Sequence, residues 1–361
     1  MPASPWPLVA LVSVVGCRPA SGHVDSPRPP HSMHRTLIGA AWDDPARCST
    51  AVAAGAAMPR SRFRLRAASW NLEGFPEGPL RGASKDGTDI EWLACDLLWL
   101  DVDVVALQGL TLDRHGLVAL DRLVTRLGAG SHTTWQWQVD GCVAGSRPQV
   151  AILWRTDRVQ GSLVVSHPEI DLTAPTDAEH PDCPGRRGPA LGVYVRSVSG
   201  PLGFHFVTFA LAAGQELDAL QARRAAWRQL GGVVKARARL RPDGDVLIAA
   251  AFNSVGGRGE ERVEAQAEHD ELKAVLAKAE PPLTLLAPTD ACSEYSYNHA
   301  RATDFMVMSG SSRAGRGVTP RAAGLCGALH CQEVDPEAYL ALKQLSSHCP
   351  LVFDLNDLPE K

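Results

Sequence analysis

The chain has 361 residues, of which 45% are hydrophobic and 21% charged, a composition typical of a folded globular protein and not of a disordered or collagen-like chain. Its 36 basic and 40 acidic residues give a net charge of −4, so it lacks the broad positive field with which proteins bind bulk nucleic acid. The 32 glycines and 26 prolines favour many short elements joined by turns over an architecture of long helices.

The first residues have the pattern of an export signal. An apolar run from Leu8 to Val15 is far shorter than the roughly 20 residues of a membrane-spanning helix. Gly16 and Cys17 follow it directly, which resembles the lipobox of bacterial lipoproteins, where the signal is cleaved before an acylated cysteine. We therefore predict a signal over residues 1–17, export to the bacterial cell envelope, and attachment to a membrane, on its periplasmic or surface side, through Cys17. Because no Lys or Arg precedes the apolar run, an ordinary signal or a misplaced start codon is the alternative.

The next segment, residues 18–61, is rich in Pro, Ser, Ala, Gly and His and has no sustained apolar period. Such a segment buries too little apolar surface to offset the entropy lost on ordering. We expect a flexible tether here, followed by one folded domain over residues 62–361.

Eight cysteines remain beyond Cys17, and an even number behind an export signal is compatible with disulfide bonds. We expect Cys326 and Cys331, which lie close together in a glycine-rich loop, to pair with each other. Cys142 and Cys183 are a second candidate pair. A zinc site that includes Cys326 and Cys331 is the alternative, although only His330 lies nearby to complete it.

Short apolar segments typical of buried strands alternate with helical patterns in the folded part. The strand segments are residues 64–70, 103–108, 149–154, 192–198, 204–209, 245–250, 303–308 and 351–355. A capping box from Thr88 to Glu91 predicts the start of a helix, and apolar residues at helical spacing predict two more helices, over 217–234 and 263–276. Seven Lys and Arg residues between 223 and 241 are expected on a solvated helix face.

Seven short motifs at the predicted strand ends occur in the order seen in the endonuclease/exonuclease/phosphatase superfamily. They are Ala68–Leu72, Val104–Gln108, Val150–Trp154, Phe206–Leu211, Ile248–Asn253, Thr303–Phe305 and Ser346–Pro350. The chain resembles this DNase I-like group from about Arg64 to Leu355, and the segment from Cys292 to Tyr295 is similar to an element of some exported bacterial members. The resemblance implies an α+β fold, a four-layer α/β/β/α sandwich with two mixed β-sheets packed face to face and a site at the strand ends.

Members of this superfamily hydrolyse phosphoesters with a divalent cation, usually Mg²⁺, held by carboxylates. The family carries a metal-binding carboxylate, a phosphate-binding histidine and two further aspartates at four positions of its site. By the resemblance, this chain has lost all four groups. These positions are Gly109, Ala210, Ala251 and Ser347 respectively. When catalytic groups act as a unit, removing even one of them abolishes most of the enzyme's activity, so the loss of all four should leave almost none. We therefore predict a pseudoenzyme without a bound metal or cofactor, which acts by binding a protein partner or a phosphate-bearing ligand.

The resemblance also identifies four positions that keep the family's residues. They are Asn71, Asn253, Asp304 and His348, which we interpret as a vestigial set of hydrogen-bonding groups. The alternative is an active phosphodiesterase or phosphatase with a rearranged Mg²⁺ site. Glu73 would then replace the missing carboxylate, because residues two apart in a strand lie on one face. Since Gly74 marks the start of a loop, we expect Glu73 to be a solvated loop residue.

Overall fold

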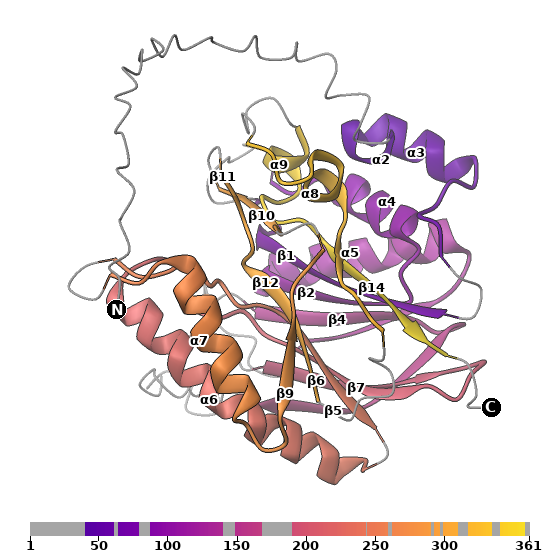
Figure 1. Cartoon of the computed structure of the whole chain (residues 1–361). Helices are drawn as coiled ribbons and strands as arrows, with labels where there is room; N and C mark the ends of the chain where they lie inside the picture. Colours follow the sequence, from indigo (N-terminus) through magenta and orange to yellow (C-terminus); the bar gives the residue numbers. More distant parts are fainter. Residues whose placement is uncertain are drawn as a thin grey trace, which may run out of the picture.

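A computed structural model describes residues 40–60, 64–78, 87–139, 149–167, 190–242, 244–258, 262–289, 292–296, 299–309, 317–333 and 340–357. Two six-stranded mixed sheets are flanked by helices (Figure 1). Apolar side chains from both sheets form one buried cluster between them, which includes Ala67 and Ile152 of the first sheet and Phe206 and Met306 of the second. The predicted α/β/β/α sandwich is confirmed.

The first sheet has the strand order β13–β14–β1–β2–β4–β3. These strands are β13 (Arg321–Ala322), β14 (Leu351–Asn356), β1 (Arg64–Phe75), β2 (Val104–Leu110), β4 (Gln149–Arg155) and β3 (Trp135–Val139). β1 runs parallel to β2 and antiparallel to β14. The end of β1 therefore lies beside the start of β14, at one edge of the sandwich.

The second sheet has the order β5–β6–β7–β8–β12–β9. These strands are β5 (Val159–His167), β6 (Ala190–Ser197), β7 (Gly203–Thr208), β8 (Asp245–Ala251), β12 (Asp304–Ser309) and β9 (Leu283–Leu286), and a separate hairpin pairs β10 (Glu294–Ser296) with β11 (His299–Arg301). β8 and β12 are antiparallel, with Ala251 opposite Asp304. The last residue of β8 and the first of β12 are therefore neighbours.

Two groups of helices cover the outer faces of the sheets (Figure 1). The first sheet packs against α4 (Ile90–Leu100) and α5 (Arg114–Ser131), and the second against α6 (Leu217–Leu240) and α7 (Ala265–Ala277). Two short helices, α8 (Gly324–Leu329) and α9 (Leu340–Gln344), precede β14. Among the helices that the structure describes, none combines the length and apolar character needed to cross a bilayer.

Helix starts differ slightly from the predicted ones. The cap of α4 is Asp89 and not Thr88, since the Asp89 carboxylate accepts a hydrogen bond of 3.0 Å from the backbone N–H of Trp92. Helix α7 begins at Ala265, because Val263 forms an isolated bridge with Gly257 instead of a helical turn. For α4, both Thr88 and Asp89 have side chains that can cap a helix, so the conformation of the flanking chain decides that Asp89 is the cap.

The predicted tether is wrong for residues 40–60, which belong to the folded unit. Helices α2 (Ala40–Asp43) and α3 (Pro45–Ala53) pack beside α4 (Figure 1). Trp42 is buried, with its ring 5.8 Å from that of Trp70, and a disulfide joins Cys48 to Cys95 of α4. These helices are too short to show a helical period, and one indole and one disulfide attach them to the core.

The basic stretch of α6 is not entirely a solvated face, because Arg223 and Arg237 are fully buried. The Arg223 guanidinium lies 2.5 Å from the Glu268 carboxylate and donates to three loop carbonyls, those of Ala212, Gly214 and Gly256. It therefore joins the loops that follow β7 and β8. The expectation of solvation is wrong for Arg223 and Arg237 because both lie on the side of α6 that packs against the second sheet.

Arg237 is held by neutral acceptors. It donates to the Nδ1 atom of His205 at 3.1 Å and to the carbonyls of Gly192 and Leu163 at 3.3 and 3.0 Å. Burial lowers the pKa of Arg237 to about 10. Since a guanidinium only donates, Nδ1 of His205 is the acceptor in this contact.

Candidate functional site

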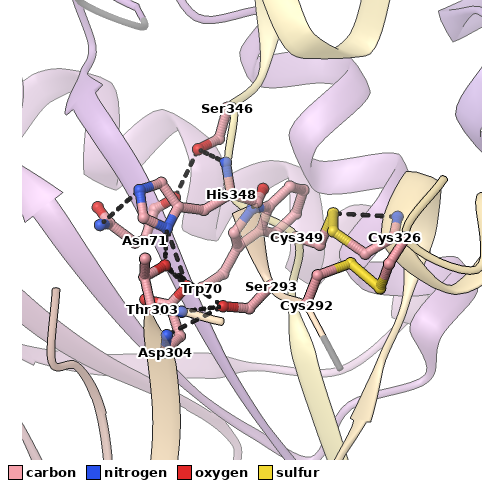
Figure 2. Close-up of a disulfide and its surroundings, with 11 residues drawn as sticks. Trp70, Asn71, Cys292, Ser293, Thr303, Asp304, Cys326, Ser346, His348 and Cys349 are labelled. Atoms are coloured by element: carbon pink, nitrogen blue, oxygen red, sulfur yellow. Dashed lines mark hydrogen bonds and ion pairs between the residues drawn. A yellow bond between two sulfur atoms is a disulfide. The ribbon is translucent and has the colours of Figure 1, made fainter. Parts of the chain in front are cut away.

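Three residues that lie far apart in sequence meet at the edge where β1 ends (Figure 2). Asn71 is near the end of β1, Asp304 begins β12, and His348 lies three residues before the start of β14. The Asp304 carboxylate lies 2.8 Å from Nδ1 of His348, and the Asn71 side-chain nitrogen lies 3.3 Å from Nε2 of the same ring. The exposed fractions are only 8% for Asn71, 3% for Asp304 and 6% for His348. The structure thus brings together three of the four retained residues in a buried cluster.

The backbone around His348 is fixed from two sides. The indole Nε1 of Trp70 donates to the His348 carbonyl at 2.9 Å, and the His348 N–H donates to Oγ of Ser346 at 3.0 Å. Ser346 in turn donates to the Asn71 carbonyl at 2.6 Å. These bonds join the loop before β14 to the end of β1, so the imidazole has a defined position (Figure 2).

Asp304 is positioned by a serine that the sequence analysis did not select. Oγ of Ser293 accepts the backbone N–H groups of Thr303 and Asp304, at 3.0 and 2.9 Å. The Thr303 hydroxyl donates to Oδ2 of Asp304 at 3.1 Å, whereas Oδ1 has no hydrogen-bond partner among the described residues. Ser293 lies within the Cys292–Tyr295 element, so the signal was present in the sequence without a role attached to it.

His348 is the cation of this cluster. Burial acts to lower its pKa, but the carboxylates of Asp304 and Glu294, the hydrogen bond with Asp304 and the charge of Glu73 outweigh burial and raise the pKa of His348 to about 10. Glu294 is buried and forms an isolated backbone bridge with His348. At neutral pH these carboxylates therefore favour an imidazolium. Because an imidazolium carries a proton on Nε2 as well, it requires the Asn71 amide, whose nitrogen lies 3.3 Å from Nε2, to present its oxygen there instead.

The space at Gly109, where the resemblance implies a metal-binding carboxylate in the family, is filled by β1. Gly109 has a φ of +69°, and a Cβ there would lie 2.5 Å from Oδ1 of Asn71 and 2.7 Å from the backbone nitrogen of Glu73. The pairing of β1 with β2 shifts register between Asn71 and Phe75, and Glu73 has a φ of +49°. This irregular turn of β1 occupies the space that a side chain at position 109 would need.

Two other altered positions are accommodated within the sheet. Ala251 is fully buried opposite Asp304 and forms an isolated bridge with Ala210. Asn253 follows β8 with a φ of +53° and donates to the Leu211 carbonyl at 2.7 Å. Its side chain therefore connects two loops, and it makes no hydrogen bond with the Asp304–His348 pair.

The expectation for Glu73 is wrong. It lies within β1 and is half-buried, and its carboxylate accepts a hydrogen bond from the hydroxyl of Ser347. Glu73 and Ser347 thus bind each other next to His348. The turn at Gly74 predicted a solvated loop, but β1 continues to Phe75, which is fully buried and holds the end of the strand on the core.

The predicted Cys326–Cys331 pair is also wrong. Cys326 is bonded to Cys349, the residue after His348, and Cys331 is bonded to Cys292, the residue before Ser293. Cys326 is buried in α8 and faces the loop before β14, so a partner distant in sequence lies closer than Cys331. Because both cysteines are in disulfides, neither is available to zinc. Cys17, Cys142 and Cys183 lie outside the described residues.

The donor set does not fit a Mg²⁺ ion. Within the part of the chain that the structure describes, no group of three or more His, Cys, Asp and Glu residues is placed to hold a metal. The carboxylate of Asp304 binds His348 and that of Glu73 binds Ser347. Hard cations need several free oxygen ligands around one point. Here one oxygen of each of these carboxylates is engaged with a protein group, and Oδ1 of Asp304 alone does not make a coordination shell.

A small hollow lies on one side of His348. Its volume is about 10 Å³, and it lies between Trp42, Trp70 and the loop before β14. A cavity of this volume has room for roughly one water molecule. Asn71, Glu73 and Asp304 do not line it, so it lies on another side of His348 from these three residues.

Comparison with solved structures identifies the fold as that of the DNase I-like enzymes. The catalytic domain of human Nocturnin is 16% identical with a TM-score of 0.51, over 82% of this chain and 96% of that one. A mannosyl-6-phosphatase from Bacteroides thetaiotaomicron is 16% identical with a TM-score of 0.51, over 81% and 99%. An endonuclease/exonuclease/phosphatase from Bacteroides vulgatus is 15% identical with a TM-score of 0.50, over 81% and 99%. No protein-family model and no curated protein sequence matches the chain.

Proposed function

We propose that the chain is a catalytically inactive member of the endonuclease/exonuclease/phosphatase superfamily, with a binding role in place of hydrolysis. The fold and the ordered motifs support the superfamily. The proposed loss of activity rests on one observation. At Gly109, where the resemblance puts the metal-binding carboxylate, the backbone of Glu73 and the side chain of Asn71 leave no room even for a Cβ atom. The neighbouring strand has adapted to the lost side chain, so the change extends beyond one substitution.

The charge of the cluster supports the same proposal. Three carboxylates, those of Glu73, Glu294 and Asp304, surround the single imidazolium of His348. Without a divalent cation, this excess of negative charge disfavours the approach of a phosphate anion. A protein partner is therefore favoured over a phosphate-bearing ligand at this edge of the sandwich.

The alternative is a phosphodiesterase or phosphatase with a relocated Mg²⁺ site. The observation in its favour is that Glu73 is directed towards Ser347 and His348 rather than into solvent. It requires Glu73 to exchange its hydrogen bond with Ser347, and Asp304 its contact with His348, for a cation. The net free energy gained by binding the cation would be small, because both carboxylates would give up charge-assisted hydrogen bonds.

Calorimetric titration of the purified full chain with MgCl₂ and MnCl₂, alongside hydrolysis of a generic phosphodiester on the same sample, tests the proposal. We expect neither saturable binding up to millimolar metal nor turnover. Saturable binding together with turnover would overturn it if both are abolished in Glu73→Gln and Asp304→Asn but persist in Glu91→Gln. Glu91 is an exposed glutamate on α4 and serves as the matched control.

We also propose that the protein is exported and anchored to a membrane by acylation of Cys17. Three disulfides among the described residues support an oxidising compartment, since such bonds are rare where thiols are kept reduced. In bacterial cells we expect the chain in the membrane fraction and Cys17→Ser in the soluble fraction. A Cys17→Ser chain that stays with membranes would contradict lipid anchoring, and metabolic labelling with a palmitate analogue identifies the acyl group directly.

A further inference from the structure

A second feature lies at the opposite end of the first sheet from His348. A hollow of about 520 Å³ is lined by Pro59, Arg60, Arg64, Gly317, Thr319, Arg321 and Asp354. Arg64 begins β1, seven residues before Asn71. At about 3.3 Å per residue, Arg64 lies roughly 23 Å along the strand from Asn71. The hollow is therefore a separate feature of the fold.

We propose that this hollow binds a dianionic phosphate monoester group through its arginines. The proposal goes beyond the pseudoenzyme assignment and does not depend on it. Three guanidinium groups line the hollow, from the chain before β1, from β1 itself and from β13. Guanidinium groups present paired N–H donors that match the oxygens of phosphate.

The charge around the hollow is positive, although the whole chain is negative. The arginines that line it or share its ion pairs are Arg60, Arg64, Arg66, Arg155, Arg158 and Arg321, and their carboxylate partners are Asp101, Asp103, Asp157 and Asp354. Among the described residues six cations face four anions, which leaves an excess of two positive charges. A phosphate dianion balances that excess, and a neutral ligand does not.

The ion pairs hold some of these arginines in place and leave others with free donors. Arg60 lies 2.8 Å from both Asp101 and Asp103, which fixes its guanidinium at the wall of the hollow. Among the described residues the Arg321 guanidinium forms an ion pair with Asp354 alone, at 3.2 Å, and 41% of its side chain is exposed. Arg64 is exposed, and its guanidinium has no partner among the described residues. The free N–H groups of Arg64 and Arg321 are therefore available to a ligand.

Of the described residues that line the hollow, Asp354 is the one acidic group, and two arginines neutralise its charge. Arg66, which is fully buried, binds its two oxygens at 2.6 and 3.2 Å, and Arg321 contacts one of them. The carboxylate therefore repels an incoming anion only weakly. Its main effect is to orient Arg321 beside Arg64.

The test is calorimetric titration of the full chain with inorganic phosphate, followed by the same titration of Arg64→Ala and Arg321→Ala. We expect saturable binding that weakens about tenfold in each variant, the effect of losing one charged hydrogen-bonding partner. Arg196→Ala is the matched control, because Arg196 is an exposed arginine on β6 outside the hollow, and it should bind as the parent does. The proposal is overturned if phosphate does not saturate the chain, or if Arg196→Ala weakens binding as much as Arg64→Ala does.

A second arm identifies the source of the phosphate group. The full chain carrying Cys17→Ser, which cannot be acylated there, is sedimented with phosphatidylcholine vesicles that contain or lack phosphatidic acid. Binding only to vesicles with phosphatidic acid, lost in Arg64→Ala, identifies a lipid headgroup as a source. Binding of inorganic phosphate without such sedimentation identifies a soluble phosphate monoester. The tests of metal binding and hydrolysis do not involve these arginines, so failure here leaves the proposed function standing.

Discussion

Replacement of Asp304 by alanine is expected to destabilise the folded chain by about 3–5 kcal/mol, because removing one partner of a buried ion pair leaves the other charge uncompensated. His348 would keep only Glu294 and Glu73 as carboxylate neighbours, while its imidazole stayed buried. Urea denaturation monitored by tryptophan fluorescence measures the change. Glu91→Ala is the control, since Glu91 forms exposed ion pairs with Arg122 and Arg126 and its loss should cost less than about 1 kcal/mol.

The same pair predicts how stability depends on pH. The pKa of His348 is raised to about 10 in the folded chain, whereas an unfolded histidine titrates near 6.5. The contribution of protonated His348 to the free energy of unfolding is therefore complete below about pH 6.5 and is lost as the pH rises towards 10. The free energy of unfolding should fall by up to about 1.4 kcal/mol per pH unit over this range. In Asp304→Ala this slope should become shallower. A parent chain equally stable at pH 6.5 and pH 9.5 would contradict the assignment of an imidazolium.

Substitution of Gly109 by glutamate is expected to cost about 3–5 kcal/mol and to restore no hydrolysis. The residue needs a φ of +69°, and its Cβ would lie within 2.7 Å of both Oδ1 of Asn71 and the backbone nitrogen of Glu73. Backbone strain contributes about 1–3 kcal/mol and overpacking a similar amount. Restoring the family's carboxylate therefore also requires β1 to refold around it.

Two alanine variants separate strain from collision. Gly55 has a similar φ, +79°, but no atom lies within 4 Å of the Cβ it would carry. Gly55→Ala should therefore show the cost of the positive φ alone, about 1–2 kcal/mol, and Gly109→Ala the larger cost of strain plus contact. Equal losses in the two variants, measured by urea denaturation, would show that the bulge of β1 gives way easily. Turnover in Gly109→Glu would contradict the proposal that the site cannot be rebuilt by one substitution.

The layers of the fold could be predicted from local pattern. Apolar runs such as Val104–Leu107 and Ile248–Ala250 indicate strands covered on both faces, and the structure has both at the centres of their sheets. The absence of a carboxylate at Gly109 and of an aspartate at Ala251 is equally plain in the sequence. A residue type determines which atoms are present, and no folding event supplies an oxygen that the side chain lacks.

The direction of individual side chains depended on contacts between distant segments. Glu73 is turned towards Ser347, which lies 274 residues away. Cys326 bonds Cys349 instead of its near neighbour Cys331, and Arg223 is buried because Glu268 of another helix and three loop carbonyls receive it. Spacing along the chain specifies a period and therefore a face, but a partner is chosen by which groups the packed sheets and helices bring within a few ångströms. The residue types at these positions are therefore legible in the sequence, while the bonds that their side chains make form through the packing of the whole domain.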